Sequence, residues 1–121
     1  MTKIKAIRID SANRRFHEVE LDQNDTDAIC GFVGCSMFDV VRVENRDVIF
    51  VDDEGLLTAN EDTHFFTVGK YHGILVGNGL VVGTDDEGES VDAETTIEWL
   101  ENNISFGKMV KHNEELIPVL L

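Results

Sequence analysis

The stretch Gly73–Glu89 constrains the fold of this chain most, because it holds the densest apolar run in the sequence. Within it, Asn78-Gly79 is a two-residue hairpin signal, since a type I′ turn needs positive φ at both central residues and Asn and Gly tolerate this best. The run then ends in the acidic reversal Asp85–Gly88. We therefore expect two core strands joined at Asn78-Gly79 and followed by a sharp turn.

Further strands are predicted where apolar and β-branched residues lie between polar turns. These segments are Lys3–Ile9, Arg14–Leu21, Phe38–Glu44 and Val48–Asp52, with turns at residues 10–13 and 44–47. The continuous apolar run 48–51 is typical of a central strand. Phe65–Val68 fits either a strand or a segment that simply fills the core.

Two helices are predicted. In residues 24–33, Asn24 or Thr26 can cap the start, and Gly34 is placed to end the helix. In residues 92–104, with Asp92 or Ser90 as cap, apolar side chains recur at helical period; they are Ala93, Ile97, Leu100 and Ile104. The element order predicts a single α+β domain over residues 1–121, with a mostly antiparallel sheet of five or six strands covered by two helices.

The composition is unusually acidic. The chain has 24 Asp and Glu against 10 Lys and Arg, a formal net charge of −14. Such a protein is repelled by nucleic acid and anionic lipid and attracted to basic surfaces, although solubility or a salty cytoplasm would explain the same charge. Residues 71–107 carry eight acidic and no basic side chains. We therefore predict a partner-binding surface formed by Asp85, Asp86, Glu87, Glu89, Glu94, Glu98 and Glu101.

The second predicted helix adds two details to this surface. Glu94, Glu98 and Glu101 lie at i, i+4 and i+7, so their carboxylates would line one ridge of the helix. A helix face that is merely exposed to solvent would explain the same spacing. Trp99, the only tryptophan, lies about 160° from the apolar stripe. We expect it to point away from the core and to contact the partner.

No catalytic constellation, cofactor or metal site is predicted. The glycines near residue 79 precede a strand, whereas a phosphate-binding loop must open a helix. Cys30 and Cys35 lie about 140° apart around a helix, so they would not face one metal if that helix continued. A disulfide between them is the less favoured alternative. Without an apolar leader or a spanning segment, the two cysteines indicate a reducing cytoplasm.

The apolar C-terminal segment predicts self-association. Pro118 cannot donate to a ladder, so we expect this segment at a sheet edge or buried against another subunit. A symmetric homodimer would bury this patch on both subunits. Salt would strengthen the dimer by screening the repulsion between the two acidic chains. The predicted interface consists of Leu116, Ile117, Val119, Leu120 and Leu121.

Four segments carry recognisable strand and turn motifs. They are Lys3–Asp10, Gly34 leading into Asp39–Arg42, Asp52–Leu57 with Asn60, and Leu80–Gly88. Together they resemble a family of small phage- and plasmid-carried proteins of unknown function. The likeness covers residues 3–90, whereas the helix and tail of residues 91–121 depart from it. The resemblance implies a compact α+β domain on a mobile element and supplies no catalytic residues.

The favoured function is therefore a non-catalytic accessory protein of a phage or other mobile element. It would bind a basic host protein through its acidic surface, as a nucleic-acid mimic or counter-defence inhibitor. The alternative is a small-ligand or nucleotide-binding, sponge-like oligomer with Arg8, Arg14 and Arg15 around the phosphates. A second alternative is an uncharacterised enzyme, which a pocket joining a Cys with a His would support.

Overall fold

Ten strands and two helices make up the computed structural model over the residues it describes, which are 2–43, 45–69 and 73–121. Every pairing among these strands is antiparallel, which confirms the α+β class. In chain order the elements are β1 (Lys3–Asp10), β2 (Arg15–Asp22), α1 (Thr26–Val33), β3 (Phe38–Arg42), β4 (Asp47–Asp52), β5 (His64–Val68), β6 (Leu75–Val76), β7 (Gly79–Thr84), β8 (Ser90–Val91), α2 (Ile97–Asn103), β9 (Ile104–His112) and β10 (Glu115–Leu120).

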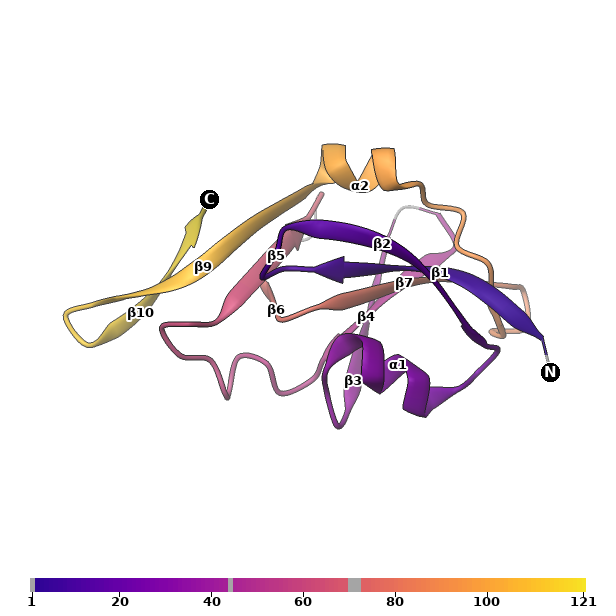
Figure 1. The fold of residues 1–121 in the computed structure, drawn as a ribbon, viewed down its shortest axis with the longest axis horizontal. Coiled ribbons are helices and arrows are strands. Elements are labelled where there is room, and N and C mark those ends of the chain that lie inside the picture. The colour runs from indigo at the N-terminus through magenta and orange to yellow at the C-terminus, as the bar shows by residue number, and fades with distance from the viewer. Residues whose placement is uncertain (1, 44, 70–72) are drawn as a thin grey trace.

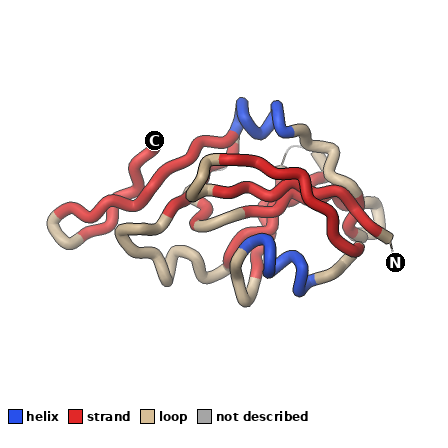
Figure 2. The backbone as a smooth tube through the Cα atoms, in the orientation of Figure 1, coloured by secondary structure: helices blue, strands red, loops and turns tan. Residues whose placement is uncertain are grey.

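The strands form two sheets rather than the single predicted one. The larger sheet has the order β2-β1-β7-β4-β3, with β8 added to β7, and the smaller has the order β10-β9-β5-β6. Figures 1 and 2 show α1 below the larger sheet and α2 above it. The strand expected to be central is β4, which lies between β7 and β3.

Apolar side chains leave the larger sheet on both faces and build two cores. On the face toward α1, Ile4, Leu80 and Val82 pack with Ile29 and Val33. The other face packs against α2 and the smaller sheet, through a group that includes Ile9, Ile49, Val81, Phe66 and Leu100. Because β7 is buried on both sides, its sequence reads as a nearly continuous apolar run. β1 also buries apolar residues on both faces, but Lys3, Lys5 and Arg8 interrupt them.

The predicted hairpin at Asn78-Gly79 is wrong, because the chain crosses here from one sheet to the other. β6 pairs with β5, whereas β7 pairs with β1 and β4. Positive φ falls on Gly77, at 84°. Asn78 instead accepts a hydrogen bond at its Oδ1 from the Ser11 amide, at 3.1 Å. A Cβ at Gly79 would lie 2.9 Å from Ile49 and Phe66, so this glycine permits close packing between the sheets.

The predicted helix over residues 92–104 is shorter than expected. α2 begins at Ile97, and its cap is Thr96, whose side chain accepts from the Trp99 amide. Residues 92–96 are extended because they bind neighbouring strands; the Ala93 amide, for example, donates to the Lys5 carbonyl at 2.9 Å. Ile104 starts β9 and pairs with Val68. The apolar stripe therefore does not lie on one helix.

The first helix agrees with the prediction more closely. It begins at Thr26, and its cap is Asp25, which accepts from the Ala28 amide, rather than Asn24 or Thr26. Gly34 ends it with φ of 81°, as predicted. The strand expected over Phe38–Glu44 ends at Arg42; Glu44 lies outside the described residues.

Candidate functional site

The acidic turn between β7 and β8 is held rigidly by its own hydrogen bonds. Asp85 Oδ1 accepts from the amides of Glu87 and Glu89, each at 2.9 Å. The Gly88 amide donates to the Asp85 carbonyl at 3.1 Å, and Gly88 has φ of 80°. The side chains of Asp86, Glu87 and Glu89 are exposed. Of the four acidic residues predicted here, Asp85 therefore organises the turn and the other three face solvent.

Two polar contacts attach the acidic turn to neighbouring segments. Arg46 Nη1 lies 2.7 Å from Asp86 Oδ1, and Asn24 Nδ2 donates to Glu89 Oε2 at 2.7 Å. Both side chains of the ion pair are mostly exposed, and exposed pairs contribute little to stability. These contacts therefore orient the carboxylates more than they stabilise the fold.

A buried carboxylate that the sequence analysis missed anchors the segment between the turn and α2. Asp47 is 1% exposed, and its two oxygens accept from the Glu94 amide at 3.1 Å and the Thr95 amide at 2.7 Å. No local pattern around residue 47 indicates a partner 48 positions away. The clamp keeps residues 94 and 95 extended and leaves the Glu94 side chain exposed.

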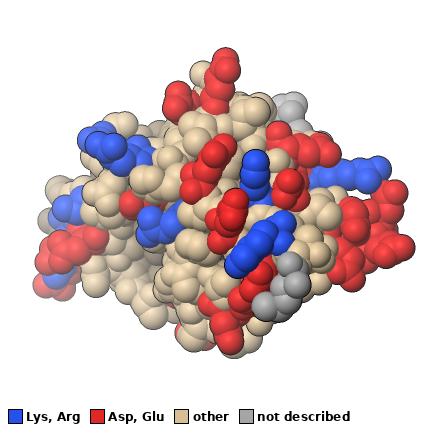
Figure 3. Space-filling model, turned by 45° about the vertical axis from the view of Figure 1, so that its right-hand side comes forward, with Lys and Arg blue, Asp and Glu red and all other residues tan. Residues whose placement is uncertain are grey.

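The remaining predicted residues lie on or beside α2. Glu98 and Glu101 are exposed on the helix, but Glu94 precedes it, so the three carboxylates do not form the predicted helical ridge. Trp99 is half-buried and packs against the core between the two sheets, so the prediction that it points away is wrong. Figure 3 shows Asp and Glu spread over one face of the molecule, with Lys and Arg among them.

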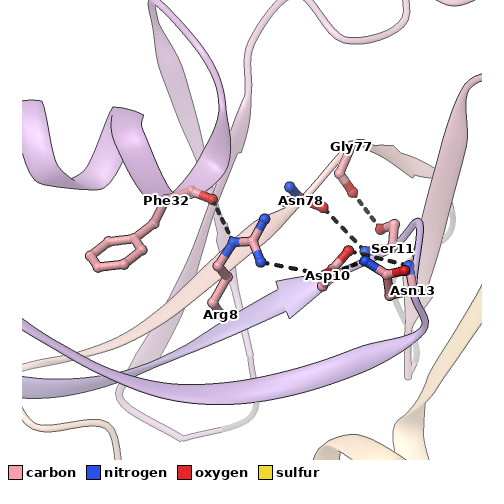
Figure 4. Close-up of polar contacts among 7 residues, drawn as sticks. All are labelled: Arg8, Asp10, Ser11, Asn13, Phe32, Gly77 and Asn78. Carbon is pink, nitrogen blue, oxygen red and sulfur yellow. Dashed lines mark hydrogen bonds and ion pairs between the residues drawn. The ribbon is translucent and has the colours of Figure 1, made fainter.

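Arg8 takes part in a polar network that joins the β1–β2 turn to α1 (Figure 4). Its Nε donates to the Phe32 carbonyl at 3.1 Å, and its Nη1 lies 3.5 Å from Asp10 Oδ2. Asp10 also accepts from the amide and side chain of Asn13, at 3.2 and 2.9 Å. Burial works to raise the pKa of Asp10, but the bonds from Asn13 and the charges of Arg8 and His17 outweigh it and lower that pKa below 3.8.

The same network extends to the crossover between the sheets. Ser11 is 1% exposed; its hydroxyl donates to the Gly77 carbonyl and its amide to Asn78 Oδ1 (Figure 4). The positions of Asp10 and Ser11 at the end of a strand gave no sign of this long-range role. The network therefore has a structural function and leaves Arg8 engaged within the fold.

The other two arginines of the nucleotide-binding alternative, Arg14 and Arg15, line a shallow hollow of about 400 Å³ at the start of β2. Arg14, Arg15 and His17 line it together with Phe16, Ile97 and Glu101. Arg14 and Arg15 are exposed. The structure thus brings two of the three arginines of the nucleotide-binding alternative into one hollow and leaves Arg8 out of it.

β10 is exposed along its length, as is the end of β9 from Val110 to His112, and this part of the β9–β10 hairpin projects from the body (Figure 1). Its turn residues, Asn113 and Glu114, have φ of 50° and 66°. β10 is an edge strand, as predicted for the C-terminal segment. The five predicted interface side chains are all exposed, Leu121 by 65%. They are Leu116, Ile117, Val119, Leu120 and Leu121.

These apolar side chains divide between the two faces of the hairpin. Val110 lies opposite Ile117 and Lys108 opposite Val119, and opposite residues in an antiparallel pair share a face. Val110, Ile117, Val119 and Leu121 therefore share one face, which we call the apolar hairpin face. The other face carries Leu116 and Leu120 beside Met109, which is buried against Phe65 and Val76.

Two kinds of feature are absent from the described residues. Within residues 2–43, 45–69 and 73–121, no three His, Cys, Asp or Glu side chains come together as metal ligands. In that same part of the chain, no helix is long and apolar enough to cross a membrane.

Comparison with known proteins gives one family assignment. Neither the curated proteins nor the solved structures contain a significant match to this chain. The family model described as "Domain of unknown function (DUF3846)" matches residues 4–105. The match spans the larger sheet, both helices and the start of β9, and it ends before the exposed part of the β9–β10 hairpin. The chain therefore belongs to the DUF3846 family of domains of unknown function.

Proposed function

We propose that this protein is a non-catalytic accessory protein that binds a basic host protein through the β7–β8 turn and the segment leading to α2. The acidic turn is the observation that carries the proposal. Asp85 fixes the backbone of this turn through two hydrogen bonds, so the backbone that carries the exposed side chains of Asp86, Glu87 and Glu89 loses little conformational freedom when a partner binds. Preorganised carboxylates of this kind suit Lys and Arg side chains on a basic surface.

The net charge adds a long-range contribution to this binding. At −14, the protein attracts basic proteins and speeds their encounter at low ionic strength. A partner that normally binds nucleic acid offers the right basic surface, so we propose that the acidic surface acts as a nucleic-acid mimic. The resemblance of four sequence segments to phage- and plasmid-carried proteins supports a mobile-element setting, the host cytoplasm as the compartment and a counter-defence role.

Charge-neutral variants test the acidic surface directly. The triple variant Asp86→Asn, Glu87→Gln and Glu89→Gln keeps the Asp85 hydrogen bonds, whereas a matched control replaces Glu18, Glu20 and Asp27 by their amides. Tagged proteins are used to capture partners from host lysate at low and high salt. We expect a basic protein to be retained by the wild type and the control but lost from the turn variant and at high salt. Equal retention by both variants would contradict the proposal, as would no partner at either salt.

A second candidate function is favoured by the hollow at the start of β2. Arg14, Arg15 and His17 line it beside the aromatic ring of Phe16, which is the chemistry that an anionic aromatic ligand such as a nucleotide needs. Glu101 also lines the hollow and repels an anion, which places this function second. Thermal-shift measurements with nucleoside phosphates should show stabilisation that the variant Arg14→Ala, Arg15→Ala removes; a nucleotide that stabilises both proteins equally binds elsewhere.

The proposed functional form is a homodimer formed through the apolar hairpin face. The hairpin suits a second copy because its side-chain charges balance, with Lys108 and Lys111 against Glu114 and Glu115, in a chain that is otherwise acidic. Two copies that meet here keep their acidic turns apart. Pairing of one face with its own copy buries Ile117 and Val119 of both subunits in an isologous contact.

Sedimentation of single variants tests the dimer. Ile117→Glu places a charge at the centre of the apolar hairpin face. Leu57→Glu is the control, because Leu57 is 85% exposed in the loop between β4 and β5 and is not part of that face. We expect a monomer for Ile117→Glu and a dimer for Leu57→Glu, with tighter association at higher salt. A wild-type protein that sediments as a monomer in low and high salt would refute the dimer.

A further inference from the structure

The two cysteines meet at the C-terminal end of α1, contrary to the geometry of a continued helix. Gly34 ends α1 with φ of 81° and reverses the chain. The Gly34 and Cys35 amides both donate to the Cys30 carbonyl, at 2.7 and 3.1 Å. This cap turns the Cys35 side chain back over the helix end. The two sulfur atoms, Sγ of Cys30 and Sγ of Cys35, lie 3.6 Å apart.

The surroundings of the two thiols differ. Burial raises the pKa of Cys35 to about 12, and the hydrogen bond to Cys30 and the Asp52 carboxylate act in the same direction. Cys30 is half-buried, and its Sγ donates to the Ser36 carbonyl at 3.7 Å. Because the thiolate is the attacking species in disulfide exchange, Cys30 is the residue that reacts first with an external disulfide.

We propose that Cys30 and Cys35 form a redox-responsive dithiol that closes to an intrachain disulfide when a low-molecular-weight disulfide such as oxidised glutathione is the oxidant. The Cys30 thiolate attacks one sulfur of that disulfide, which breaks its S–S bond and releases one glutathione. Cys35 then loses its proton to water and attacks the Cys30 sulfur, which releases the second glutathione. The protein loses two hydrogen atoms, and the oxidant gains them as two thiols.

Closure requires only a local change. The sulfurs must approach from 3.6 Å to a bond length of about 2.05 Å, a change that side-chain rotation and a small shift of the cap can supply. The resulting bond links the last turn of α1 to the segment that leads into β3. It would therefore fix one end of the helix that covers the core formed by Ile29, Val33 and Leu80.

Oxidation of the full-length protein tests the proposal. The protein is incubated with excess oxidised glutathione, free thiols are blocked with N-ethylmaleimide, and intact mass and peptide mapping are recorded. We expect the wild type to lose two hydrogens, add no maleimide and yield a peptide cross-linked between Cys30 and Cys35. The Cys35→Ser variant should stop at a glutathione adduct on Cys30. The Cys30→Ser variant should react with oxidised glutathione several-fold more slowly than the Cys35→Ser variant does.

The rate of closure gives a second readout that does not depend on those variants. Asp52→Asn keeps a side-chain oxygen for the Glu54 amide but removes the charge that disfavours the Cys35 thiolate. It should speed the second step several-fold, whereas Asp53→Asn, the adjacent control, should not. A wild-type protein that stops at the mixed disulfide, or that cross-links only between chains, would overturn the proposal. Equal rates for Asp52→Asn and Asp53→Asn would contradict the assigned order of attack.

Discussion

The acidic turn and the β9–β10 hairpin are two exposed regions that are held in place by different forces. The acidic turn and the segment after it depend on side-chain carboxylates, namely Asp85 within the turn and Asp47 beneath residues 94 and 95. The hairpin depends on backbone pairing between β9 and β10 and on its attachment to β5. One region is charged and rigid, and the other is apolar and balanced in charge.

One small domain can thus present two surfaces of opposite character. Carboxylates can stay in water at no desolvation cost, so the acidic turn is stable whether or not a partner is bound. Exposed apolar side chains each gain free energy on burial, so the apolar hairpin face has a driving force for association. The family match includes the first region and stops short of most of the second.

The largest effect is expected from a variant that removes the Asp47 carboxylate beneath the segment that follows the acidic turn. Asp47→Ala leaves the amides of Glu94 and Thr95 without their acceptor in a buried position and should destabilise the protein by about 3 kcal/mol, because bonds to a charged acceptor are among the stronger ones. Denaturant unfolding measures this loss. Amide hydrogen exchange should show the loss of protection first at residues 90–96, while the amides of β10 keep their protection. An equal loss of protection in β10 would mean that the two regions are not independent.

The next largest effect is expected from acid at the β1–β2 turn, a third segment that a carboxylate, Asp10, holds in place. The pKa of Asp10 is lowered in the folded protein, so its contribution to stability is present at pH values above 3.8 and is lost as the pH falls through the lowered value. Asp10→Asn should cost about 2 kcal/mol at pH 6, and its difference from the wild type should shrink below pH 3.8. Urea unfolding at a series of pH values checks this. A constant difference down to pH 2 would show that the Asp10 charge is irrelevant.

A smaller effect on stability is expected at Asp85, whose side chain fixes the acidic turn. Asp85→Ala removes the acceptor for two amides in an exposed turn and should cost about 1 kcal/mol. Asp85→Asn keeps an acceptor oxygen and should cost less than half as much. Amide exchange at Glu87 and Glu89 by NMR reports the loosening. Unchanged exchange in the alanine variant would show that the backbone alone fixes the turn.

The smallest effect on folding stability concerns the edge of the hairpin. The Leu121 amide donates inward to the Phe106 carbonyl, so alternate residues of β10 face β9 and Pro118 falls in the outward set. Pro118→Val should change the free energy of unfolding by less than about 0.5 kcal/mol, yet it adds an outward N–H in the middle of the edge. Light scattering should then detect larger assemblies than those of the wild type. A Pro118→Val protein of unchanged size would show that the edge is blocked by other means.

Local patterns predicted the elements that depend on local forces. The strands of the first hairpin, the helix ending at Gly34 and the turn Asp85–Gly88 follow from apolar segments between polar turns, a glycine cap and turn residues, and the structure contains all of them. The α+β class was predictable for the same reason. The partner surface and the dimer stay predictions, since they concern molecules outside the chain.

Elements that depend on distant residues were not predictable. The Asn78-Gly79 pair has the composition of a tight hairpin, but pairing of β7 with β1 and β4 fixes it as a crossover. The turn with positive φ at both residues occurs at Asn113 and Glu114, which carry a weaker signal. Likewise, the apolar period of residues 93–104 was genuine, but Asp47 holds residues 94 and 95 extended and shortens the helix.

The position of β7 between β1 and β4 has a consequence for how the chain folds. The pairs β1–β2 and β3–β4 are hairpins between neighbours in sequence, so each can form soon after its residues are available. The two hairpins become one sheet only when residues 79–84 insert between them. Since closing long loops slows folding, that insertion should be the late, rate-determining event. Until then, both hairpins carry an open edge that a chaperone or a second chain can capture.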